Sequence, residues 1–233
     1  METPFRRNRN VILTNAIKER KRRRRTIKKN LVMFDYDGVL VDSLDVFATT
    51  FIAASHACGY YGIKTHEQVV RLFDGNFFET LAQLGLSNQK VNEILGDAHD
   101  RKVQKHLAKV KPFHGMHASL NVIARQNLLT VISSNDSQLV WQLLEKEDIT
   151  CFDEVIGADK EKSKVKKIQK TMSRYQDMPA FYVGDTKGDM IEGKQAGAVT
   201  VAVTWGWHST EKLSEGSPDH MVHTLAELEK LLS

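Results

Sequence analysis

Four short apolar runs restrict the fold of this chain more than any other feature of its sequence. Each run is hydrophobic on both of the faces that a β-strand would present, and stretches with helical spacing separate the runs. The runs are 31–34, 128–132, 180–183 and 199–203. Strands of this kind are typical of a parallel sheet that is covered by helices on both sides. The sequence therefore predicts an α/β fold with a Rossmann-like, doubly wound parallel sheet.

The alternation of strands and helices stops between residues 44 and 111. Hydrophobic spacing there predicts consecutive helices over 44–57, 65–73, 77–84 and 87–109. Thr65 and Gln68 have the spacing of a capping box, and Pro112 with Gly115 marks the return to alternating structure. We expect residues 44–111 to form an all-helical cap over the end of the first strand. The catalytic core would then consist of residues 30–43 and 112–233.

The net charge of +4 is an average over two different segments. Residues 1–29 contain 12 Lys or Arg and two Glu, so this segment carries +10 and the remainder carries −6. Such a basic arm could contact nucleic acid through phosphates, but charge density alone gives no sequence recognition. We expect residues 1–29 to be a solvated, largely disordered extension.

The chain has two cysteines, Cys58 and Cys151, which are too few for a disulfide framework. No apolar run approaches the length of about 18 residues that a membrane span requires. The first residues also lack the apolar core of a secretory signal. These features favour a cytoplasmic protein without a membrane partner, and they leave its oligomeric state open.

Polar residues follow three of the apolar runs, at the edge of the sheet where ligands of parallel α/β folds bind. Carboxylates that lie close together repel one another unless a cation neutralises them, and hard oxygen ligands select Mg²⁺. The sequence thus indicates a magnesium site at this edge. The candidate residues are Asp35, Asp37, Ser134, Asn135, Asp185 and Asp189.

The order and spacing of these residues form three motifs. They read Asp35-Tyr-Asp-Gly-Val-Leu-Val-Asp-Ser, Val131-Ile-Ser-Ser-Asn and Val183-Gly-Asp-Thr-Lys-Gly-Asp-Met. In these motifs the chain resembles the haloacid dehalogenase-like hydrolases, and a cap placed after the first motif resembles the subgroup that includes phosphoglycolate phosphatase. The second aspartate of the first motif favours phosphoryl transfer over dehalogenation.

The resemblance implies a role for each acid. Asp35 would be the nucleophile that forms an aspartyl-phosphate, and Asp37 would be the general acid and base. Mg²⁺ would be held by the carboxylates of Asp35 and Asp185 and by the backbone carbonyl of Asp37. Asp189, one helical turn beyond Asp185, would support the metal site.

The same resemblance implies groups that bind the phosphate. Ser134 and Asn135 would contact the phosphoryl oxygens, with Ser134 preferred to Ser133. A lysine at the start of the helix before the third motif would also contact them, and the sequence offers Lys164 as first choice and Lys162 as second.

The substrate is less constrained than the chemistry. We expect a small phosphorylated metabolite, for example phosphoglycolate. The alternatives are a sugar phosphomutase, a carbon–phosphorus bond hydrolase, or a nucleic-acid-associated protein that uses its basic arm. In the cap, His56, Arg71 and Asn76 are candidate substrate contacts, although each fits a surface or packing role better. Trp205, Trp207 and His208 follow a predicted strand and could line the rim of the site, although packing explains them better.

Overall fold

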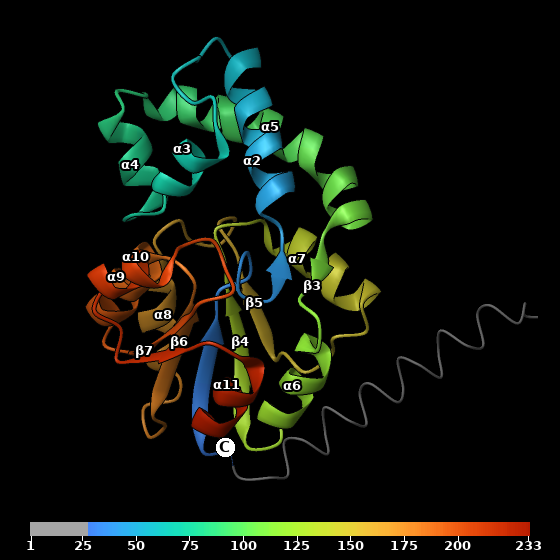
Figure 1. The fold of residues 1–233 in the computed structure, drawn as a ribbon, viewed down its shortest axis with the longest axis vertical. Coiled ribbons are helices and arrows are strands. Elements are labelled where there is room, and N and C mark those ends of the chain that lie inside the picture. Colours follow the sequence, from blue (N-terminus) through green and yellow to red (C-terminus); the bar gives the residue numbers. More distant parts are fainter. Residues whose placement is uncertain (1–27) are drawn as a thin grey trace, which may run out of the picture.

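The computed structural model describes residues 28–233, so most of the basic arm lies outside the described residues. Six parallel strands form the main sheet in the order β5-β4-β1-β6-β7-β8 (Figure 1). The prediction of a doubly wound parallel sheet is therefore confirmed. The strands are β1 (Asn30–Phe34), β4 (Asn127–Ile132), β5 (Glu154–Ile156), β6 (Ala180–Gly184), β7 (Val199–Val203) and β8 (His220–Val222).

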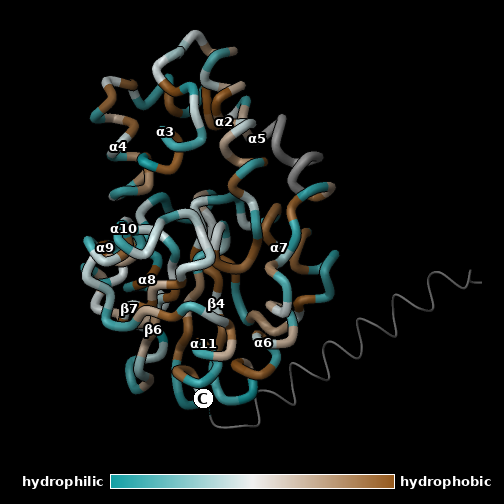
Figure 2. Tube along the Cα trace, viewed as in Figure 1, coloured by the Kyte–Doolittle hydropathy of each residue, from teal (hydrophilic) through white to brown (hydrophobic). Residues whose placement is uncertain are grey.

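The central strand β1 explains why the sheet is covered on both faces. Val32 and Phe34 belong to the hydrophobic core on one side, and Leu31 and Met33 belong to the core on the other. All four side chains are fully buried, and Figure 2 shows hydrophobic colour along the strands at the centre of the sheet. A strand with four consecutive apolar residues cannot leave either face to solvent.

Helices of the core lie on both faces of this sheet. One face is covered by α6 (Met116–Ile123), α7 (Ser137–Lys146) and α11 (Leu225–Leu231), which contribute to the same hydrophobic core as Phe34. The other face is covered by α8 (Lys164–Met172), α9 (Lys187–Ala196) and α10 (Thr210–Glu215).

Four helices form a second hydrophobic core above the carboxyl ends of the strands (Figure 1). They are α2 (Leu44–Ala57), α3 (His66–Arg71), α4 (Phe77–Gln83) and α5 (Asn88–Lys109). The predicted capping box at the start of α3 is present, since Thr65 accepts from the backbone of Gln68 and the Gln68 side chain accepts from that of Thr65. A two-stranded antiparallel ribbon of β2 (Val41–Asp42) and β3 (Lys111–Pro112) joins the two connections between the helical cap and the sheet.

None of the helices among the described residues is long and apolar enough to cross a membrane.

Candidate active site

The candidate residues come together because their strands are neighbours. β1 lies between β4 and β6, so Asp35, Ser133 and Asp185 follow three adjacent parallel strands at the same edge. After β1 the chain turns at Gly38, which has a φ of +76°. A Cβ at this position would lie 2.0 Å from Oδ2 of Asp185. Only glycine therefore allows the first motif to pass so close to the third.

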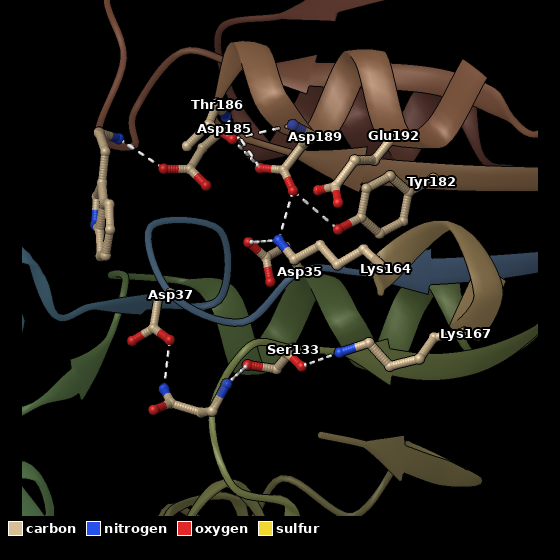
Figure 3. A network of polar contacts seen from close by, with 12 residues as sticks. Asp35, Asp37, Ser133, Lys164, Lys167, Tyr182, Asp185, Thr186, Asp189 and Glu192 are labelled. Carbon is tan, nitrogen blue, oxygen red and sulfur yellow. Dashed lines mark hydrogen bonds and ion pairs between the residues drawn. The ribbon is translucent and has the colours of Figure 1, made fainter. Parts of the chain in front are cut away.

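Asp35, Asp185 and Asp189 form a buried acidic cluster. One carboxylate oxygen of each lies within 4.8 Å of the others, and their exposed fractions are 7%, 0% and 0%. Lys164 is the cation beside them. Its Nζ donates to Oδ2 of Asp35 at 2.9 Å and to Oδ1 of Asp189 at 2.6 Å (Figure 3).

The two acids of the third motif have different surroundings. Asp189 receives hydrogen bonds on both oxygens, from Tyr182 and Lys164 on Oδ1 and from the backbone and hydroxyl of Thr186 on Oδ2. Asp185 accepts from the backbone N–H of Trp207 on Oδ2, at 2.7 Å. Its Oδ1 is buried and has no hydrogen-bond partner among the described residues. Asp189 is thus held by the protein, whereas Asp185 keeps one oxygen free for a ligand.

Burial and mutual repulsion control the protonation of this cluster. Burial raises the pKa of Asp35 to about 7, although Lys164 opposes the increase. Burial and the charges of Asp189 and Asp35 raise the pKa of Asp185 well above its usual range. Burial also acts to raise the pKa of Asp189, but its ion pair with Lys164 outweighs this effect and the pKa is lowered.

These residues fit a divalent cation. The unpartnered Oδ1 of Asp185 is a hard oxygen ligand, and the raised pKa values show that one lysine does not neutralise three buried carboxylates. A divalent cation bound to Asp35 and Asp185 would neutralise the excess negative charge of the cluster. The chain thus contains a buried acidic group that can hold a metal ion.

Asp37 lies apart from the acidic cluster, on the side of the second motif. Its Oδ2 accepts a hydrogen bond from the amide of Asn135 (Figure 3), and its Oδ1 has no hydrogen-bond partner among the described residues. Ser134 and Asn135 line the same cavity as Asp35 and Asp37. Ser133 is instead fully buried, and its hydroxyl accepts from the backbone N–H of Asn135 at 3.0 Å. The geometry therefore favours Ser134 over Ser133 as a ligand contact.

The two candidate lysines differ in position. Lys164 is buried between two carboxylates, since Ser163 caps α8 and places the next residue at the edge of the sheet. Lys162 is exposed, and its Nζ donates to Oδ1 of Asn92 in the cap at 3.2 Å. The lysine beside the nucleophile candidate is thus Lys164.

The three cap candidates do not line the cavity, and each has another role. His56 contacts the carbonyl of Ile63 at 3.0 Å, and Arg71 forms an exposed ion pair with Glu67. Asn76 caps α4 and donates to Oε1 of Glu192 at 2.7 Å. Their positions agree with a surface or packing role, Arg71 being a surface residue.

Trp207 lines the cavity, but its neighbours on the predicted rim do not. The indole of Trp205 donates to the carbonyl of Val39 at 3.1 Å. His208 is buried, and its Nδ1 accepts from the backbone N–H of Lys187 at 2.9 Å. Packing thus accounts for Trp205 and His208, whereas Trp207 also borders the site.

Polar contacts hold the cap against the core beside the cavity. Besides the Asn76–Glu192 hydrogen bond, Lys212 forms an ion pair with Asp74 at 2.7 Å. The backbone N–H of Gly188 donates to the carbonyl of Phe73 at 3.0 Å. These contacts join α9 and α10 of the core to the cap segment between α3 and α4, so the cap covers the acidic cluster.

Three residues around the cluster were not predicted from the sequence. Tyr182 donates to Asp189, Glu192 accepts from the cap, and Lys167 donates to the carbonyl of Ser133 at 2.5 Å. Burial and the neighbouring charge of Lys164 lower the pKa of Lys167 to about 8. Helical spacing held a signal for two of them, because Lys167 and Glu192 lie three residues after Lys164 and Asp189 on the same faces.

Comparison with known proteins agrees with this geometry. A family model described as haloacid dehalogenase-like hydrolase matches residues 32–203. A phosphoglycolate phosphatase from Synechococcus elongatus is 28% identical over 206 residues, which cover 84% of this chain and 94% of the relative. The pyrophosphatase PpaX from Bacillus thuringiensis is 24% identical over 215 residues, covering 89% and 98%.

Solved structures show the same fold. The crystal structure of a predicted phosphatase from Clostridium acetobutylicum superposes with a TM-score of 0.76 at 20% identity, covering 88% of this chain and 98% of the other. The family match spans the first motif, the cap, the second motif and the third motif, in the order in which the structure assembles them around Asp35. The chain belongs to the haloacid dehalogenase-like hydrolase family.

Proposed function

We propose that this protein is a Mg²⁺-dependent phosphatase that hydrolyses a small phosphorylated metabolite through an aspartyl-phosphate on Asp35. In this proposal residues 30–43 and 112–233 are the catalytic core, and residues 44–111 are the cap. The observation that carries it is the arrangement around Asp35. A buried carboxylate lies 2.9 Å from the Lys164 ammonium, beside a free oxygen of Asp185, and borders the same cavity as Asp37.

The first step transfers the phosphoryl group to the protein. A carboxylate oxygen of Asp35 attacks phosphorus, and the bond between phosphorus and the ester oxygen breaks. Asp37 gives its proton to the departing oxygen, so the alcohol leaves neutral. Asp37 suits this role because it is close enough to share the cavity yet stands outside the acidic cluster, with one oxygen unpartnered.

The second step restores the enzyme. Asp37, now ionised, takes a proton from water, whose oxygen attacks phosphorus. The bond between phosphorus and Asp35 breaks, inorganic phosphate leaves, and both carboxyl groups return to their starting states. A single residue can serve as acid and then as base because the first displacement requires a proton donor and the second requires a proton acceptor.

The remaining residues hold the phosphoryl group and the metal ion. Ser134, Asn135 and Lys164 would donate to the phosphoryl oxygens, and their hydroxyl, amide and ammonium groups are the donors that such oxygens require. Asp35, Asp185 and the backbone carbonyl of Asp37 would hold Mg²⁺, and Asp189 would orient Lys164. When bound, Mg²⁺ supplies positive charge that reduces repulsion between the phosphoryl group and the Asp35 carboxylate.

The proposal is tested by phosphate release with and without Mg²⁺. We expect hydrolysis of a generic aryl phosphate that requires Mg²⁺ and falls by a factor of at least about 10³ in Asp35→Asn. Asp153→Asn is the matched control, because it removes the charge of an exposed aspartate. Full turnover by Asp35→Asn would show that the nucleophile is another group. Phosphoglycolate and pyrophosphate are the first physiological substrates to compare, since relatives that act on them match most of this chain.

A further inference from the structure

The cavity above the catalytic residues has two chemically different ends. It has a volume of about 340 Å³ and reaches from the sheet edge into the cap. Its polar end contains Asp35, Asp37, Ser134, Asn135 and Lys164. On the cap side the cavity is bordered by six aromatic side chains, which we call the aromatic wall: Phe47, Phe51, Phe73, Phe77, Phe78 and Trp207. Three charged residues of the core, Asp136, Asp159 and Lys162, also line the cavity.

The aromatic wall is a packed array of rings. Phe73 and Phe77 stack with their centroids 4.9 Å apart, and Trp207 lies 5.3 Å from Phe47 and 5.0 Å from Phe73. Phe78 meets Phe77 edge to face at 5.4 Å. Trp207 comes from the core and the others from the cap, so the wall spans the junction between the two. Rings that support one another in this way cannot easily turn aside to expose polar groups beneath them.

Only two of the described cap side chains that line the cavity carry hydrogen-bonding groups, and each makes a contact within the protein. They are Thr50 and Asn92. Thr50 donates its hydroxyl hydrogen to the carbonyl of Val46 in its own helix, and Oδ1 of Asn92 accepts from Lys162. The described part of the cap therefore offers a mainly apolar surface, rich in aromatic rings, to the organic portion of a substrate.

The dimensions allow one ring beside the phosphoryl group. An apolar cavity of about 150 Å³ is sufficient to hold benzene, and the cavity here is about 340 Å³. An aromatic ring of a substrate would contact the faces and edges of the rings in the aromatic wall. A hydrated group placed there would lose its hydrogen bonds to water and gain only apolar contacts, which disfavours its binding.

We propose that the substrate is the phosphate monoester of an alcohol that carries an aromatic ring, with the ring bound against the aromatic wall. This inference rests on the proposed function and narrows it. It separates the substrate of this protein from small hydrophilic esters such as phosphoglycolate, whose organic portion has no ring.

The test compares two esters of equal reactivity. Ethyl phosphate and 2-phenylethyl phosphate both release primary alcohols, so they differ mainly in the ring. With Mg²⁺ present, we expect kcat/KM for 2-phenylethyl phosphate to exceed that for ethyl phosphate by about 10- to 100-fold. Equal values would overturn the inference and leave the proposed function intact. If neither ester nor a generic aryl phosphate releases phosphate, both the proposed function and the inference fail.

Variants of Phe78 locate the ring. Phe78 is half-buried at the start of α4, so replacing it disturbs the cap less than replacing a buried ring would. Phe78→Ala should reduce the ratio between the two esters several-fold, and Phe78→Leu should retain most of it. Leu84→Ala is the control, because Leu84 follows α4, is 47% exposed and does not line the cavity. It should leave the ratio and both rates unchanged. A ratio that Phe78→Ala leaves unchanged would place the ring elsewhere and overturn the assignment.

Discussion

Lys164→Met removes the cation from the acidic cluster and keeps an unbranched apolar side chain of similar length. The side chain of Lys164 is 7% exposed, and its ammonium lies 2.6 Å from Asp189 and 2.9 Å from Asp35. The variant therefore leaves buried carboxylates without their protein cation. We expect a large loss of folding stability when no metal ion is present.

The magnitude follows from these distances. At an effective dielectric constant of about 20, each ion pair corresponds to an attraction of about 6 kcal/mol. Burying an ammonium costs several kcal/mol, and the variant no longer bears that cost. Breaking buried pairs of this kind costs about 3–5 kcal/mol, because the remaining charges stay buried and uncompensated. We expect a decrease of this size in the free energy of unfolding.

Urea denaturation followed by tryptophan fluorescence measures this change, in EDTA at pH 8. The control is Lys160→Met, which removes an exposed lysine that forms an ion pair with Asp159 at 3.1 Å. That variant should change stability by less than about 0.5 kcal/mol, since exposed pairs contribute little. Mg²⁺ should restore part of the stability that Lys164→Met loses and should have little effect on Lys160→Met relative to the unmodified protein.

Two results would refute this reasoning. A loss below about 1 kcal/mol would mean that the cluster neutralises itself by taking up protons at little cost. A loss of the expected size that Mg²⁺ does not reduce would mean that a divalent cation cannot reach the carboxylates that Lys164 no longer neutralises. Either outcome would contradict the description of Asp35 and Asp185 as parts of one metal-binding cluster.

Other changes test the turn, the titration and the arm. Gly38→Ala should destabilise the fold by at least about 1 kcal/mol more than Gly59→Ala. Both glycines have a positive φ, but only a Cβ at position 38 would collide with another residue, Asp185. Equal losses of stability in urea denaturation would argue against the close approach of Gly38 to Asp185. Burial raises the folded-state pKa of Asp35 from 3.8 to about 7. In EDTA the contribution of Asp35 to folding stability should therefore fall as the pH rises from 3.8 to about 7. The decrease should be at most about 1.4 kcal/mol per pH unit. Unfolding measured against Asp35→Asn isolates this effect, and a parallel pH dependence in both proteins would contradict it. Deletion of the residues before Thr26 should leave kcat/KM unchanged and abolish any salt-sensitive binding to DNA or RNA; loss of hydrolysis would link the arm to the enzyme.

The sequence predicted the central strands because their signal is local. β1, β4, β6 and β7 lie inside the sheet, where all but one residue of each strand is buried, so each strand is mainly apolar. The edge strands β5 and β8 have three residues each and were not predicted. A run of three residues is too short to show whether its hydrophobic pattern is that of a strand.

The bounds of helix α9 were missed for a different reason. Its sequence, Lys187 to Ala196, includes two glycines and four charged residues, so it lacks a clear hydrophobic stripe. Its start is fixed by a capping box between Thr186 and Asp189. Because Asp189 also accepts a hydrogen bond from Lys164, a residue of this capping box lies in the candidate site. The sequence suggested a functional role for Asp189 and placed it one helical turn beyond Asp185, but it did not give the bounds of the helix.

By itself, the sequence determined the fold class and the set of acids, because burial on both faces and the spacing of the motifs are properties of short segments. Only the tertiary structure decided between Lys164 and Lys162, since both follow the same loop and differ in which one reaches Asp35. It also decided that phenylalanines predicted only as helix residues form one wall over the site. Such contacts depend on how α2, α4 and the loops pack in space, and the hydrophobic period within one segment carries no signal for contacts with another segment.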